Sequence, residues 1–129
     1  MKHFSFGLPI FVSFLVWIGI ALAAPMLAGS EWGISSNPKQ FIQFQSNGRV
    51  AGHGGCNRFF GSYKQSEDSL QFGPLGATKM MCPAEIMQQE DALFAILSKV
   101  DRFERKRHLL KLFDSFGQDI VTLRQRDWD

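Results

Sequence analysis

Two cysteines constrain the fold of this chain more than any other feature. Cys56 lies in the glycine-rich segment GHGGCNRFFGSY, residues 52–63, and Cys82 directly precedes Pro83. A bond between them would stabilise the domain by roughly 3–4 kcal/mol through the loop that it closes. An isolated pair of this kind usually forms a disulfide in an oxidising compartment, so the pairing depends on where the protein resides.

The N-terminus indicates export. Lys2 precedes an uncharged run over residues 4–30, and Ala21-Leu22-Ala23 form an A-x-A cleavage site. This order predicts a signal peptide over residues 1–23, with cleavage after Ala23 and a periplasmic or secreted protein. An uncleaved membrane anchor is the alternative, because the run exceeds the ~18–20 apolar residues that span a bilayer. Pro9 and the small residues near the end of the run favour cleavage.

The sequence predicts short strands and one helix for the rest of the chain. Residues 42–45 alternate between apolar and polar side chains, and Asn47-Gly48 predicts a hairpin turn whose return strand contains Val50. Further strands are predicted over residues 59–64, 70–72, 102–107, 108–113 and 120–126. Pro83 begins the helix, whose apolar face would contain Ile86, Leu93, Ile96, Leu97 and Val100, with Glu90 and Asp91 in solvent. The result is an α+β domain whose antiparallel sheet curls around the helix or closes into a barrel.

Two kinds of chemistry compete with a structural role for the cysteines. Cys56 could act as a nucleophile with His53 as its base, in a small thiol enzyme or hydrolase. His53, Cys56, Cys82 and His108 could hold a metal, although they lack the paired spacing typical of zinc sites. The glycines match neither phosphate-binding loop pattern. Neither histidine has a recognisable catalytic flanking sequence, so we expect no metal, no cofactor and no catalytic residue.

A basic cluster lies near the predicted strands over residues 102–113. It contains Arg102, Arg105, Lys106, Arg107 and Lys111, in a chain whose formal net charge is only +2. Such a cluster attracts anionic partners, or it keeps strand edges from pairing between molecules. We favour the second role and expect at most a weak, salt-sensitive contact with anionic surfaces, and no nucleic-acid partner.

Two ordered motifs carry a family resemblance. The chain contains G-C-N-x-[FY]-x-G-x-Y at residues 55–63 and T-x-M-x-C at residues 78–82, followed by a helix in which Glu90, Phe94 and Leu97 match. This order resembles the META domain family of HslJ-like proteins, over residues 32–127 after a polar lead-in at 24–31. The motif residues besides the two cysteines are Gly55, Asn57, Phe59, Gly61, Tyr63, Thr78 and Met80.

The resemblance implies a curled or conical antiparallel β-barrel-like sheet with one main packed helix. It implies no established enzymatic activity, but a link to the cell envelope and to stress. We therefore expect an exported, non-enzymatic protein that binds another protein or an apolar ligand. Asn57 would satisfy local backbone groups, and Cys56 would tie its corner to the start of the helix. Because few residues separate Trp32 from Phe41, the first strand should be short or lost, leaving an edge exposed.

Overall fold

The computed structural model describes residues 7, 9–10, 12–13 and 25–126. Most of the predicted signal peptide lies outside these residues, and so does the residue before its cleavage site, Ala23. Within the described part of the chain, no helix is long and apolar enough to cross a membrane.

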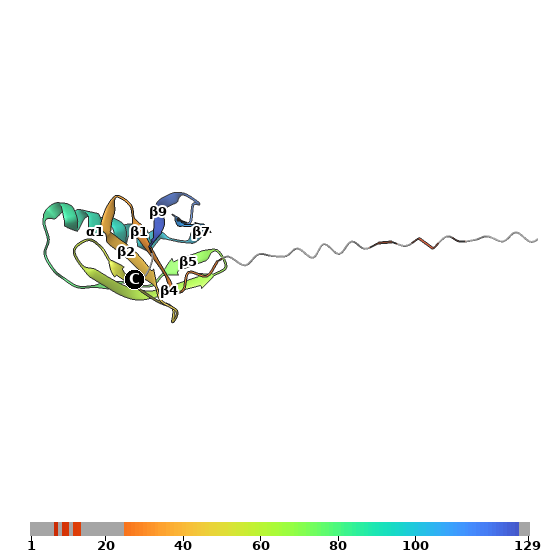
Figure 1. Ribbon diagram of the computed structural model, residues 1–129, viewed down its shortest axis with the longest axis horizontal. Helices are drawn as coiled ribbons and strands as arrows, with labels where there is room; N and C mark the ends of the chain where they lie inside the picture. Colours follow the sequence, from red (N-terminus) through yellow and green to blue (C-terminus); the bar gives the residue numbers. More distant parts are fainter. Residues whose placement is uncertain (1–6, 8, 11, 14–24, 127–129) are drawn as a thin grey trace, which may run out of the picture.

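Nine strands and one helix make up the described part of the chain, more strands than the six expected from the sequence. The strands are β1 (Ser30–Ile34), β2 (Asn37–Phe44), β3 (Arg49–His53), β4 (Arg58–Ser66), β5 (Ser69–Phe72), β6 (Gly76–Ala77), β7 (Arg102–Lys106), β8 (Leu109–Phe113) and β9 (Asp119–Arg126). The helix α1 spans Ala84–Lys99, with Pro83 at its N-cap. Figure 1 shows the helix on one side of the curled sheet.

Antiparallel pairing closes eight of the strands into a ring in the order β1-β2-β3-β4-β5-β7-β8-β9, and β9 pairs back with β1. The ring is uneven, because β5 and β7 are joined by the single residue pair Ser69 and Arg102. Strand β6 lies outside the ring and pairs with β4. The predicted α+β class with a curled sheet and one packed helix is confirmed.

Alternating residues of the strands fill the interior. Every ring strand contributes at least one buried apolar side chain, and α1 contributes Leu93 and Leu97. The largest of the fully buried side chains are Trp32, Phe44, Phe59 and Phe103. Phe59 meets Phe94 of α1 edge-to-face, with ring centroids 5.6 Å apart, so aromatic packing holds the helix against β4.

The expectation of a short or lost first strand is wrong. Strand β1 pairs with β2 on one side and with β9 on the other, so it leaves no open edge. A tight turn at Ser35-Ser36 and an irregularity at Gly33 bring β1 directly onto β2, which removes the need for a longer connection. The folded unit also begins before Trp32, because Leu27 of the polar lead-in lies fully buried in the core.

Candidate functional site

The glycine-rich corner between β3 and β4 is the most constrained part of the molecule. Gly55 has a φ of +120°, a conformation that side-chain-bearing residues rarely adopt. At Gly54 a Cβ would lie 2.5 Å from Cγ of Glu90, so only glycine leaves room for that side chain. The two glycines thus let a helix residue reach the backbone of the corner.

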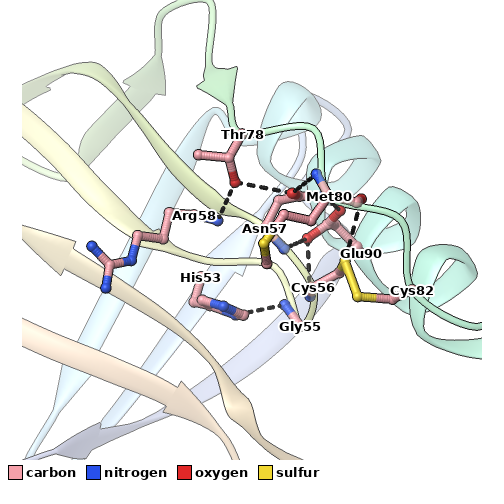
Figure 2. Close-up of a disulfide and its surroundings, with 9 residues drawn as sticks. All are labelled: His53, Gly55, Cys56, Asn57, Arg58, Thr78, Met80, Cys82 and Glu90. Carbon is pink, nitrogen blue, oxygen red and sulfur yellow. Dashed lines mark hydrogen bonds between the residues drawn. A yellow bond between two sulfur atoms is a disulfide. The ribbon is translucent and has the colours of Figure 1, made fainter.

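Glu90 of α1 is the side chain that enters the corner. It is only 2% exposed, and its Oε1 accepts hydrogen bonds from the backbone N–H groups of Cys56 and Asn57. Its Oε2 accepts a third from Nδ2 of Asn57, at 2.8 Å. Figure 2 shows the carboxylate among these donors. A buried carboxylate requires such partners, and here they are supplied by the loop that carries Cys56.

The sequence-based placement of Glu90 in solvent is therefore wrong. Glu90 lies one helical turn from Ile86 and three residues before Leu93, which puts it on the apolar face of α1. The charge of Glu90 led to the wrong prediction. Its burial could have been predicted from its position on the helix and from its place in the family motif.

Asn57 connects the corner to the segment after β6. Its Oδ1 accepts hydrogen bonds from the Met80 N–H at 2.6 Å and the Thr78 hydroxyl at 2.9 Å. Its Nδ2 donates to the Met80 carbonyl at 3.2 Å as well as to Glu90. The amide therefore satisfies both backbone groups of Met80, as a neighbouring strand would. The expectation that Asn57 bonds local turn groups is wrong, because its side-chain partners lie more than 20 residues away.

Cys56 and Cys82 form a disulfide, with Cα atoms 6.0 Å apart. The bond ties the corner to the residue before the N-cap of α1, as expected. His53 cannot serve as the base of a free thiolate in this state, because the Cys56 sulfur is bonded. Instead, Nδ1 of His53 accepts a hydrogen bond from the Gly55 N–H at 3.0 Å. Among the residues described, no group of three His, Cys, Asp or Glu side chains could hold a metal.

The remaining motif residues pack the strand that leaves the corner. Phe59 is buried, and a Cβ on Gly61 would lie 2.8 Å from Leu75. Tyr63 packs edge-to-face on Phe44, and its hydroxyl donates to the Gln45 carbonyl at 2.9 Å. Burial raises the pKa of the Tyr63 phenol above its ordinary value of 10.0.

The predicted basic cluster divides into two groups. Arg102 lies 4.2 Å from the centroid of the Phe113 ring and pairs with Glu104. Arg105 lies over the Trp32 ring, and its Nη1 donates to the Met26 carbonyl at 2.9 Å. These two arginines support the fold. Lys106, Arg107 and Lys111 are exposed on the β7–β8 hairpin, so three of the five cluster residues remain free to meet an anionic surface.

Two grooves lie on the surface near the helix. The first, between α1 and the segment joining β5 and β6, has a volume of about 480 Å³ and is lined by Phe72, Gly73, Pro74, Leu75, Ala77, Phe94, Leu97 and Ser98. The second, of about 460 Å³, lies beside the disulfide and is lined by Pro38, Lys39, Phe41, His53, Gly55, Cys56, Met80, Cys82, Ile86 and Arg126. The first is walled mainly by apolar side chains, and the second carries cations at its border.

Comparison with solved structures finds the same fold. An NMR structure of a protein from Burkholderia xenovorans is 24% identical, with a TM-score of 0.65, and the match covers 79% of this chain and 85% of that one. A second NMR structure is 22% identical, with a TM-score of 0.57, over 76% of this chain and 90% of that one. At these identities the likeness shows the fold alone. No curated protein matches the chain.

The motif residues of the disulfide-bonded corner are those on which the sequence resemblance was based. A family model of the META domain matches residues 26–127, which is most of the chain. The chain therefore belongs to the META domain family.

Proposed function

We propose that this chain is an exported, non-enzymatic binding protein of the cell envelope, active under stress. Its ligand is an apolar molecule or an apolar segment of another protein. The observation that carries the proposal is the 480 Å³ groove between α1 and the β5–β6 segment, defined here as the apolar groove. Ligand pockets commonly have volumes of about 300–1,000 Å³ with mainly hydrophobic and aromatic walls.

The walls of the apolar groove offer few polar groups, so a ligand there would be recognised mainly by its shape. Phe72 and Leu75 come from the β5–β6 segment, whereas Phe94 and Leu97 come from the helix. Ser98 is the one lining residue with a polar side chain, and its hydroxyl already donates to the Ala95 carbonyl at 2.7 Å. An apolar ligand would bury these walls without leaving a polar side chain of the groove unpaired.

The hydrogen bonding of the corner supports a role without catalysis. Each group there that could perform chemistry has a structural partner: Cys56 is in a disulfide, and the Glu90 carboxylate accepts three hydrogen bonds. The Asn57 amide uses both of its polar atoms on neighbouring segments. The proposal of a thiol enzyme built on Cys56 and His53 would require reduction of the disulfide first.

Export is supported by the N-terminal sequence and is compatible with the disulfide. The intact mass of the protein recovered from the extracytoplasmic fraction tests it, and we expect a chain that begins at Ala24. A mass that retains residues 1–23 would show an anchor instead. Growth of a deletion strain under heat and envelope stress tests the role in stress, and growth equal to that of the parent would contradict it.

An uncharged fluorescent probe, N-phenyl-1-naphthylamine, tests the apolar groove. We expect Ser98→Trp to weaken probe binding at least tenfold, because the indole would occupy the groove. Ala92→Trp is the matched control, since Ala92 is an exposed residue of the same helix that does not line the groove. Equal probe affinity of the Ser98→Trp variant and the unmodified protein would contradict the proposed ligand site.

A further inference from the structure

A second surface, separate from the apolar groove, combines protruding apolar side chains with cations. The segment after β6 carries Lys79, Met80 and Met81, and β4 carries Arg58 and Phe60. Met81 is 88% exposed, Met80 58% and Phe60 50%, so three large apolar side chains are in solvent on neighbouring segments. We call these five residues, together with Lys39, the corner surface.

The backbone holds these residues close together. The Thr78 N–H donates to the Arg58 carbonyl at 3.0 Å, and the Arg58 N–H donates to the Thr78 hydroxyl at 3.2 Å. Phe60 pairs with Gly76, where a Cβ would lie 2.7 Å from the phenylalanine ring. The cation Arg58 and the apolar Phe60 therefore lie beside the chain that leads to Met80. In Figure 2 the Arg58 side chain extends away from the disulfide.

The exposure of Met81 is imposed by its neighbours. Met80 is fixed through both of its backbone groups by Asn57, and Cys82 is fixed by the disulfide. Met81 lies between these two fixed points, so its side chain projects into water from a braced segment. An isolated exposed apolar residue is ordinary, but an apolar group on a braced segment with cations at its border is typical of an interaction surface.

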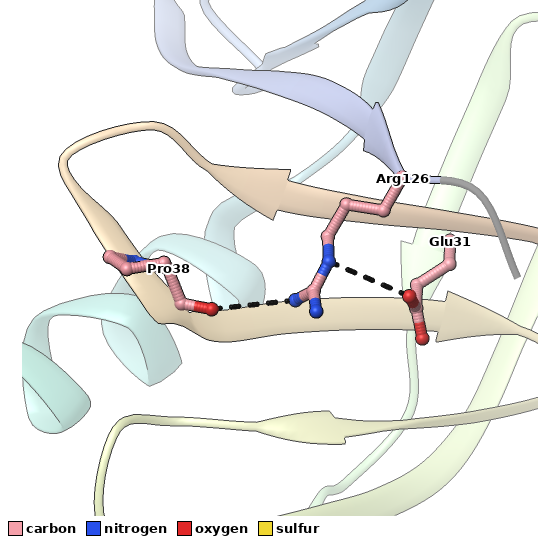
Figure 3. A network of polar contacts seen from close by, with 3 residues as sticks. All are labelled: Glu31, Pro38 and Arg126. Carbon is pink, nitrogen blue, oxygen red and sulfur yellow. Dashed lines mark hydrogen bonds and ion pairs between the residues drawn. The ribbon is translucent and has the colours of Figure 1, made fainter. Parts of the chain in front are cut away.

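Cations predominate among the charged side chains around these residues. The second groove, which Met80 lines, has cationic side chains from Lys39 and Arg126 and no acidic side chain. Arg126 is partly neutralised, because it pairs with Glu31 and lies near the Pro38 carbonyl, as Figure 3 shows. Among the residues described, Lys39, Arg58 and Lys79 form no ion pair and are exposed. The acidic residue nearest to Met81 along the chain is Glu85, in the first turn of α1.

We infer that the corner surface binds an anionic phospholipid bilayer. Met81 and Phe60 enter the boundary between headgroups and acyl chains, while Lys39, Arg58 and Lys79 bind lipid phosphates. Protruding apolar side chains ringed by long cationic ones suit a soft, negatively charged interface. A folded protein partner would instead need a pocket for Met81. This inference concerns a surface that the apolar groove does not use, and it does not depend on that proposal.

Cosedimentation with vesicles tests the inference. The vesicles contain equal parts of phosphatidylglycerol and phosphatidylcholine, or phosphatidylcholine alone. All variants carry the same N-terminus, so that any contribution from the apolar residues before Ala24 is common to all. Arg58→Glu with Lys79→Glu should weaken binding to the anionic vesicles by at least roughly 25-fold, since the loss of each cation accounts for about fivefold and the added carboxylates are repelled by the lipids.

The control reverses two cations elsewhere. Lys106→Glu with Arg107→Glu changes the net charge equally but lies on the β7–β8 hairpin, and we expect less than about threefold weakening. Met81→Ser should weaken binding roughly tenfold at both low and high salt, because it removes apolar insertion rather than charge. Thermal melting shows whether each variant is folded.

Three results would overturn the inference. Equal weakening by the two double reversals would mean that only net charge matters. Unchanged binding of Met81→Ser would exclude insertion at the corner surface. Equal binding to the anionic and the uncharged vesicles would exclude recognition of lipid charge.

Discussion

Replacing Glu90 by glutamine tests the polar network at the corner with the smallest change of shape. In Glu90→Gln one terminal atom still accepts the N–H bonds of Cys56 and Asn57, but the other becomes an amide NH₂. That group then faces Nδ2 of Asn57, which is also a donor. The Asn57 amide cannot rotate to present its oxygen, because Oδ1 already accepts bonds from Met80 and Thr78. One buried donor is left without a partner.

A buried unpaired donor costs about 1–3 kcal/mol, so Glu90→Gln should lower the free energy of unfolding by that amount. For a domain of this size the melting temperature should fall by roughly 5–20 °C. Denaturant unfolding of the oxidised protein, followed by circular dichroism, measures the change. Asp91→Asn is the matched control: Asp91 is exposed on the same helix, and its change should stay within about 0.5 kcal/mol.

A substitution at Asn57 tests the same hydrogen bonds from the other partner. Asn57→Asp alone places a second carboxylate against Glu90, and it should destabilise the protein more than Glu90→Gln does. When the two substitutions are combined, the new carboxylate at position 57 accepts a hydrogen bond from the glutamine amide, so the double variant should be more stable than Asn57→Asp alone. A Glu90→Gln variant as stable as the Asp91→Asn control, or a double variant with additive losses, would refute the reasoning.

Two further predictions follow from the disulfide and from the buried phenol. Non-reducing peptide mapping should find Cys56 linked to Cys82. Cys56→Ala should lower the free energy of unfolding by roughly 3–4 kcal/mol. Two freely alkylated thiols in natively exported protein would contradict the structural role. Tyr63 is the single tyrosine, so phenolate absorbance reports on it alone. Because burial raises the pKa of Tyr63, the phenol of the unfolded chain ionises first, and the free energy of unfolding should fall as the pH rises above 10.0. Tyr63→Phe should lack this loss of stability at alkaline pH. An equal loss in that variant would contradict the assignment to Tyr63.

Local patterns in the sequence were sufficient for most of the strands and for the helix, and two cysteines leave only one possible pairing. The alternation at Ile42 and Phe44 falls within β2, and the strand predicted over residues 108–113 is β8. The helix begins at Ala84, directly after Pro83. The Asn47-Gly48 turn also forms, with positive φ at Gly48 alone. These features depend on residues close in the chain, which a single sequence describes well.

The network around Asn57 depends on contacts that a single sequence does not encode locally. Asn57 meets Met80 and Glu90 only because β6 pairs with β4 and α1 packs over Phe59. The burial of Glu90 follows from the missing Cβ of Gly54, a complementarity between residues far apart in the sequence. The division of the basic cluster likewise required knowing that Arg105 lies over Trp32.

The pairing of β1 with β9 also determines when the domain can assemble. Glu31 lies opposite Arg126, so the ring closes only when the two ends of the domain meet. During synthesis, β1 can pair with β2 early, but it gains its second neighbour only after β9 has left the ribosome. Contacts this distant in sequence slow folding, because the chain loses loop entropy before the contacts form. A domain that completes its fold late stays open for longer, which would suit the export that we propose, because a translocation channel passes unfolded chains.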